Sequence, residues 1–158
     1  MKIGIVVHSF SGNTMSVAER LAQSLSEKGY EADILRLQVT GGENRNQQDI
    51  GKIALQPIPD MKGFDNLIVA GPVRGFQASP VIRKFFDEVN DIEGKNVAMF
   101  VTHAFPYSFF GGKSAIGQME RMCREKGAKV GFTGIIDWGS GKREKQIETL
   151  VKNITDLM

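Results

Sequence analysis

Two hydrophobic periods alternate along the chain. Short runs that are apolar at nearly every position are typical of strands covered on both faces of a parallel sheet. Apolar residues three or four positions apart are typical of helices with one buried face. Short runs predict strands at 2–7, 66–71, 96–102 and 129–136, and an alternating stretch predicts a half-buried strand at 31–37. The helical spacing predicts helices at 13–29, 79–89, 112–127 and 142–158. This alternation predicts an open parallel sheet with helices on both faces.

Some boundaries carry recognisable signals. Ser79 and Pro80 are typical of a helix start, and Gly29 is typical of a helix end. The polar segment 38–65 fits the alternation poorly, but a loop of that length without structure is uncommon. We therefore expect a short helix near 46–54. With no repeat visible, the 158 residues are expected to form one domain, 1–158.

Composition excludes several classes of protein. A formal net charge of +2, with no run rich in lysine or arginine, argues against a nucleic-acid-binding protein. No stretch approaches the ~18 apolar residues of a membrane span, and no signal peptide is recognisable at the start. The single cysteine, Cys123, excludes an intramolecular disulfide. A cytoplasmic location is the expectation.

The stretch "HSFSGNT", residues 8–14, follows the first predicted strand. In open α/β sheets, ligands bind beyond the carboxyl ends of the strands, where the loops 8–14, 71–79, 102–112 and 137–141 are expected. The first of these loops leads into a helix, whose free amides and dipole favour an anion. Its hydroxyl and amide side chains suit a phosphate monoester, whereas neither GxxxxGK[ST] nor GxGxxG is present. The alternative is that Ser9 and Ser11 only cap the helix.

The stretch "SFSGNTMSVAERL", residues 9–21, resembles the FMN phosphate loop of the flavodoxin family, through Ser9, Gly12, Thr14, Ala18 and Leu21. The resemblance extends over the whole chain in element order. It implies a flavodoxin-like, doubly wound α/β fold: a five-stranded parallel sheet of order 2-1-3-4-5 in a three-layer α/β/α sandwich. It also implies a noncovalently bound FMN.

Two later loops extend the resemblance. "GPVRGFQASP", residues 71–80, resembles the loop that meets the flavin ring, where Gly75 permits a peptide flip on reduction. Phe76 lies against the ring or, alternatively, packs under the sheet edge. "THAFPYSFFGG", residues 102–112, is richer in aromatics than typical flavodoxins and lacks their acids. The resemblance implies these cofactor-binding residues: Ser9, Phe10, Ser11, Gly12, Asn13, Thr14, Pro72, Val73, Arg74, Gly75, Phe76, Thr102, His103, Ala104, Phe105, Tyr107, Gly111 and Gly112.

The aromatic residues of the third loop have separate expected roles. Phe105 or Tyr107 is expected to stack on the flavin ring, because four aromatics within six residues exceed what a surface loop needs. Phe109 and Phe110 are expected to lead into the helix and belong to the core. The paired glycines that follow allow the backbone a close approach.

Charge separates this chain from typical flavodoxins, which carry acids around the flavin. Residues 1–18, 66–86 and 94–119 contain no Asp or Glu, which predicts a basic, acid-free rim. The same segments supply His8, Arg74, Arg83, Lys84, His103 and Lys113. If Arg74 points at the flavin, it favours the reduced, anionic form by ~1–2 kcal/mol and raises the potential. Alternatively, Arg74 is solvated or pairs with an acid from 38–65, and Arg83 and Lys84 form a wet helix face.

The remaining candidate residues are expected to have structural rather than chemical roles. His8 is expected to be structural at the end of a strand, Cys123 to be core, and Trp138 to pack across the rim. Two histidines without partners at ligand spacing give no metal site. No catalytic residue is assigned.

Three hypotheses of function remain open. The favoured one is an FMN-binding electron carrier whose redox partner proteins have an acidic docking surface. It is favoured because short relatives more often act as carriers and no nicotinamide motif is visible. The alternative is a small FMN-dependent reductase that passes hydride equivalents from NAD(P)H to a quinone-type acceptor. The third is a flavodoxin fold that has lost FMN and acts as a binding module.

Overall fold

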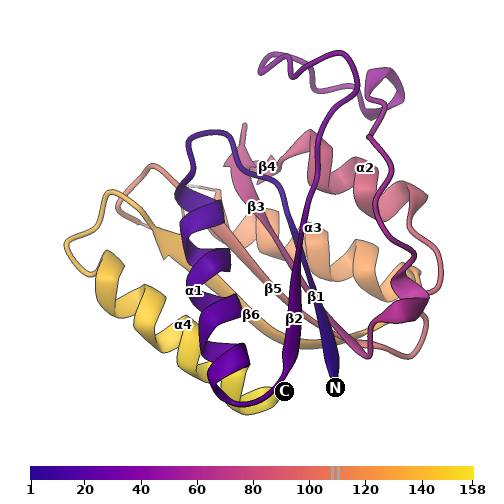
Figure 1. Cartoon of the computed structure of the whole chain (residues 1–158). Coiled ribbons are helices and arrows are strands. Elements are labelled where there is room, and N and C mark those ends of the chain that lie inside the picture. Colours follow the sequence, from indigo (N-terminus) through magenta and orange to yellow (C-terminus); the bar gives the residue numbers. More distant parts are fainter. Residues whose placement is uncertain (108, 110) are drawn as a thin grey trace.

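The computed structural model describes all residues except 108 and 110. Figure 1 shows a twisted sheet between two layers of helices. Five strands run parallel in the order β2-β1-β3-β5-β6. They are β1 (Lys2–Val7), β2 (Glu31–Arg36), β3 (Asn66–Arg74), β5 (Asn96–His103) and β6 (Lys129–Asp137). Counted without the short β4, this order is the predicted 2-1-3-4-5, so the flavodoxin-like fold is confirmed.

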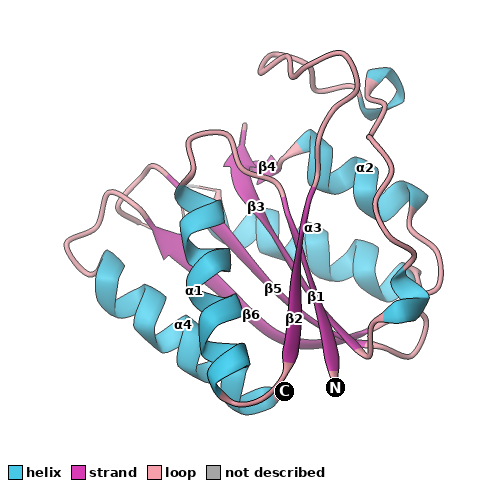
Figure 2. Ribbon diagram, in the orientation of Figure 1, coloured by secondary structure: helices cyan, strands magenta, loops and turns pink. Residues whose placement is uncertain are grey.

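The helices lie on both faces of the sheet (Figure 2). On one face, α1 (Asn13–Glu27) and α4 (Arg143–Leu157) share a core with the side chains that β1 and β5 direct toward them. On the other face, α2 (Pro80–Glu88) and α3 (Gly112–Glu125) share a core with β3 and β5. Both faces are covered, as the continuous apolar strand runs predicted. Among the described residues, no helix combines the length and apolarity needed to cross a bilayer.

A short sixth strand, absent from the sequence prediction, follows β3. β4 (Gln77–Ala78) pairs antiparallel with the end of β3, so that the second loop is a tight hairpin. Gly75 and Phe76 form its turn with φ angles of 55° and 62°. Two residues are too few to produce a visible alternation, which is why the pattern did not indicate this strand.

The predicted helix at 46–54 is wrong. The segment 38–65 contains only two 3₁₀ turns, η1 (Ile50–Lys52) and η2 (Met61–Gly63), and an isolated bridge between Val39 and Leu55. Side chains of Asn44, Gln47 and Asp49 each accept a hydrogen bond from the amide two residues later. Such local bonds compete with helical ones, and a helix this short has little stability of its own.

Candidate functional site

The loops that follow β1, β3 and β5 lie together at the carboxyl ends of these strands. They are called here the first loop (8–14), the second loop (71–79) and the third loop (102–112). The buried hydroxyls of Thr14 and Thr102 are 2.8 Å apart and join the first loop to the third. Gly111 lies against Phe76, because a Cβ placed on Gly111 would be 2.9 Å from the Phe76 Cα. The third loop therefore touches both of the others, and the predicted residues surround one edge of the sheet.

The first loop presents the N-terminus of α1 without a conventional side-chain cap. Gly12, at the N-cap position, is left-handed with a φ of 91° and has no side chain with which to cap the helix. Ser9 Oγ accepts from the Met15 amide at 3.3 Å, so capping explains Ser9 in part. The Ser11 Oγ lies 3.5 Å from the Asn13 amide, a marginal contact, and Ser11 is exposed. An exposed hydroxyl, first-turn amides and the absence of carboxylates fit a phosphate monoester.

The second and third loops place aromatic side chains around the adjoining surface. Phe76, Phe105, Tyr107 and Phe109 are all exposed, and the Tyr107 and Phe109 rings stack 5.4 Å apart at 11°. Phe76 is 59% exposed, so its alternative position under the sheet edge is wrong. Phe109 is 68% exposed, which contradicts its predicted place in the core, and Phe110 lies outside the described residues. This surface fits a flat, conjugated ring.

The contact between Gly111 and Phe76 leads to a testable prediction. Gly111→Ala is expected to weaken FMN binding about tenfold, because the residue has a φ of 96° and its Cβ would push the second and third loops apart. Fluorescence titration of the apoprotein with FMN measures this effect. Gly141→Ala is the matched control, because a Cβ on Gly141 meets nothing within 4 Å. Equal affinities of the two variants would contradict the assigned role of this contact.

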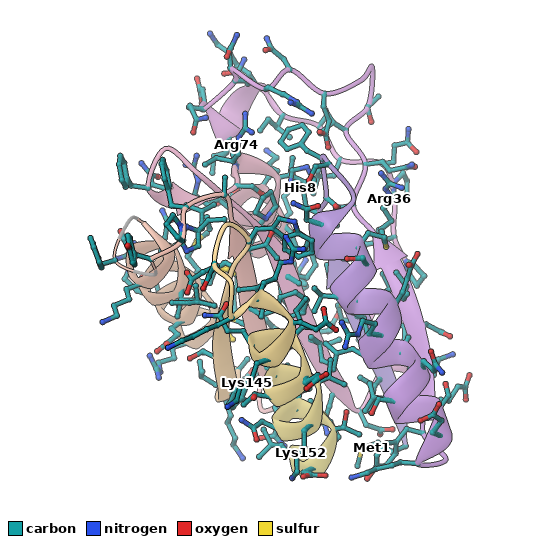
Figure 3. The ribbon with its side chains drawn as sticks, turned by 90° about the vertical axis from the view of Figure 1, so that its left-hand side faces the viewer. Met1, His8, Arg36, Arg74, Lys145 and Lys152 are labelled. Carbon is teal, nitrogen blue, oxygen red and sulfur yellow. The ribbon has the colours of Figure 1, made fainter. Side chains whose placement is uncertain are left out.

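Arg74 contacts both the first loop and the segment 38–65. Its guanidinium carbon lies 4.7 Å from the centroid of the Phe10 ring, and its Nη2 donates to the Arg45 carbonyl at 3.1 Å. In Figure 3, Arg74 and His8 lie at the same end of the molecule, beneath that segment. Arg74 thus meets an aromatic ring and a backbone carbonyl rather than an acid of 38–65, and its expected approach to the flavin stays a prediction. Phe10 likewise faces this segment.

The rim is basic in its loops but is not free of acids. Glu43, from the segment 38–65, hydrogen-bonds the buried His8, and Asp137, at the end of β6, hydrogen-bonds the buried His103. The three loops themselves contain no Asp or Glu. The prediction of an acid-free rim is nevertheless wrong, because both acids come from outside these loops. Each of these two carboxylates is hydrogen-bonded to a buried histidine.

His8 is fully buried and has a partner on each ring nitrogen. Nδ1 is 2.7 Å from the Ser79 Oγ, and Nε2 is 2.7 Å from the Glu43 Oε1. An ionised carboxylate only accepts, so Nε2–H donates to Glu43, and in the neutral ring Nδ1 then accepts from the Ser79 hydroxyl, whose oxygen also accepts from the Ile82 amide. Burial lowers the pKa of His8, with Glu43 opposing and Arg74 and Arg36 reinforcing the shift. The predicted structural role of His8 is confirmed.

The lowered pKa of His8 gives stability a pH dependence. Above the unfolded pKa of about 6.5 this contribution is complete, and it falls as pH drops toward the lower folded pKa, because the unfolded chain binds the proton first. His8→Gln is expected to reduce stability by about 2–4 kcal/mol at neutral pH and to flatten the profile between about pH 7 and 5. Urea unfolding at several pH values measures both effects. Parallel profiles for the two proteins would contradict the assignment.

His103 forms a second buried pair on the α3 side of the sheet. Its Nε2–H donates to the Asp137 Oδ1, and the Asp137 Oδ2 accepts from the Gln146 Nε2 at 2.8 Å. The His103 Nδ1 is buried and has no hydrogen-bond partner in the described part of the chain. Buried polar atoms without a partner are rare, so this nitrogen is available to a group absent from the protein itself.

The structure also shows where the other residues discussed from the sequence lie. Cys123 is fully buried in the core, where burial raises its thiol pKa to about 11. Trp138 packs against the α1 and α4 side of the core, with the Arg143 guanidinium 4.8 Å from its ring. The core assignment of Cys123 is confirmed, whereas Trp138 packs against the core rather than across the rim. Lys84 pairs with Glu88 one turn along α2, whereas Arg83 donates to backbone carbonyls of Ala78 and Gln48.

The fold and these loops define a flavodoxin-like protein, and comparison with known proteins places it in a family. Residues 1–136 match the model of the NADPH-dependent FMN reductase family, so the chain belongs to that family. The predicted FMN cofactor is thereby confirmed at the level of the family. The matched residues include all three loops.

A curated relative and two solved structures are also similar. The chain is 25% identical over 129 residues to an NAD(P)H dehydrogenase (quinone) of Archaeoglobus fulgidus, covering 72% of this chain and 66% of the relative. It therefore spans about two thirds of that relative's length. A variant of flavodoxin from Pseudomonas aeruginosa has a TM-score of 0.69 at 17% identity, with 99% and 98% of the chains covered. A flavoprotein from Lactobacillus acidophilus in complex with FMN has a TM-score of 0.60 at 15% identity, with 94% and 97% covered.

Proposed function

We propose that the protein is an FMN-dependent oxidoreductase that uses NAD(P)H to reduce a small, quinone-type acceptor. One observation carries the proposal: four exposed aromatic side chains surround the place expected for the flavin ring, on loops without a carboxylate. Such a surface favours stacking of flat substrates over docking of a protein through charge pairs. The family's description and the relative's name support the same chemistry.

The cofactor site is proposed from the loop geometry. Ser11, Asn13 and Thr14 are proposed to hold the FMN phosphate at the start of α1, with Ser9 ordering the turn. The second loop, Pro72 to Phe76, and the third, Thr102 to Gly112, are proposed to hold the ring between them. The fit is supported by the acid-free helix start and by the contact of Gly111 with Phe76.

When bound, FMN would supply the hydride and electron transfer by which NAD(P)H, a proton and the quinone become NAD(P)⁺ and the hydroquinone. The chain's own residues supply anchoring, orientation and shielding from water. Phe76, Phe105 and Tyr107 would stack with the rings that exchange the hydride. The buried His103 and Asp137 support the base of the third loop.

An electron carrier is the second candidate. It is supported by length, because the chain and several flavodoxins cover one another almost completely. Carrier function would require a redox partner protein, which the acid-poor loops would meet with their aromatic and basic groups. The third hypothesis, a fold without FMN, is opposed by membership in an FMN-dependent family.

Steady-state turnover separates the two candidates. FMN-loaded protein is expected to oxidise NADPH continuously when a water-soluble quinone is added, at a rate proportional to protein concentration. Free FMN at the same concentration is the control. If turnover does not exceed that of free FMN while the chemically reduced protein still transfers electrons to a redox protein, the carrier hypothesis is supported and the reductase is rejected.

A further inference from the structure

We propose that Arg45 and Arg74 form an anion subsite next to the flavin loops, and that it binds the 2′-phosphate of NADPH. The identity of this ligand rests on the proposed function, whereas the anion subsite rests on geometry alone. It would make the protein selective for the phosphorylated nucleotide.

The two arginines converge on one aromatic ring. The guanidinium carbons of Arg45 and Arg74 lie 4.9 Å and 4.7 Å from the centroid of the Phe10 ring. Arg74 also donates from Nη2 to the Arg45 carbonyl, which joins the two segments of chain. Cation–π contacts and this bond restrict both side chains before a ligand arrives, which reduces the entropy lost on binding.

Neither arginine is neutralised within the described residues. No carboxylate forms an ion pair with either guanidinium there, although both lie in a cavity wall that also includes Lys52. The single acid of that wall, Glu43, accepts from the buried His8 at 2.7 Å and keeps its charge, because burial lowers the pKa of His8 and favours its neutral form. Arg45, Lys52 and Arg74 still outnumber this carboxylate three to one, which favours an anionic ligand, and guanidinium groups suit phosphate oxygens.

The size and position of the cavity indicate which part of a ligand it takes. Its volume of about 120 Å³ is well below the ~300 Å³ at which whole small-molecule sites begin, so it suits one phosphate group rather than a nucleotide. Phe10 belongs to the proposed phosphate loop, and Arg74 directly precedes Gly75 and Phe76 of the ring loop. The subsite therefore adjoins both loops proposed to hold FMN, as recognition of a nucleotide at the flavin edge requires.

Binding of nucleotide fragments tests the subsite without catalysis. Calorimetry with the FMN-loaded protein is expected to show adenosine 2′,5′-bisphosphate binding at least tenfold more tightly than adenosine 5′-monophosphate, as for about one charge-assisted hydrogen bond. Arg45→Gln and Arg74→Gln are each expected to remove most of this difference. Arg20→Gln is the matched control, because Arg20 pairs with Glu144 on the opposite face of the sheet and its loss changes net charge equally.

Other outcomes of that experiment would overturn the proposal. Equal affinity for the two fragments would show that no 2′-phosphate is recognised. If instead the arginine variants weaken FMN binding and leave the fragment difference intact, the two arginines serve the FMN phosphate.

Flavin reduction by the two nucleotides separates this inference from the proposed function. Wild-type protein is expected to have a KM for NADPH at least tenfold below that for NADH, and Arg45→Gln is expected to equalise the two with little change in kcat. Reduction by both nucleotides at one KM would reject the subsite and leave the reductase intact. Reduction by neither would reject the reductase, and the fragment affinities would then decide the subsite by themselves.

Discussion

Replacing Ser11 with aspartate is expected to weaken FMN binding by about a hundredfold. A carboxylate at ~5 Å from the phosphate, at an effective dielectric of ~20, opposes it by about 3 kcal/mol. Ser11 is exposed at the start of α1, so the substitution should leave the fold unchanged. Titration of the apoprotein with FMN, followed by quenching of flavin fluorescence, measures the dissociation constant.

The matched control for this prediction is Ser11→Asn. Asparagine has nearly the shape of aspartate but no charge, and is expected to keep the affinity within about threefold, since one exposed hydrogen bond contributes little. If both variants lose affinity equally, shape rather than charge governs the loop. If neither variant loses affinity, the phosphate binds elsewhere and the proposed phosphate site at the start of α1 is wrong.

Replacing Asp137 with alanine is expected to lower the free energy of unfolding by about 2–4 kcal/mol. The substitution removes the acceptor of His103 Nε2–H and of the Gln146 side chain, and the buried His103 ring then has no hydrogen bond from either nitrogen in the described structure. Urea unfolding at neutral pH measures the difference.

Asp156→Ala is the control for that effect. Asp156 is exposed and pairs with Lys28 and Lys152 on the surface, so its loss is expected to change the unfolding midpoint only slightly. A small effect at Asp137, similar to that at Asp156, would contradict the structural importance of the His103–Asp137 pair. A large effect would identify it as the support of the third loop.

The sheet and its order were predictable because they depend on local patterns. The predicted strand 96–102, apolar from 97 to 101, corresponds to β5, Asn96–His103, and Ser79 with Pro80 marked the start of α2 as expected. The three loops were also predictable, since they follow directly from the ends of buried strands. Where the local pattern was weak, at 38–65, the predicted helix was wrong because short polar side chains bond the nearby amides.

The partners of the site residues could not be predicted in the same way. Glu43 lies 35 residues from His8, Arg45 lies 29 from Arg74, and Asp137 lies 34 from His103. Periodicity shows which face of a strand or helix is buried, but not which side chain of a distant polar loop reaches it. This is why the loops alone predicted an acid-free rim, whereas the folded chain adds two acids, each bonded to a histidine.

The most direct test of the central claim is anaerobic mixing of the FMN-loaded protein with NADPH, followed at the flavin absorbance near 450 nm. We expect the absorbance to bleach in a single turnover, to an extent set by the flavin present, and to return when a quinone is added. An absorbance that remains unchanged with both NADPH and NADH, in a protein that dithionite fully reduces, would contradict the account.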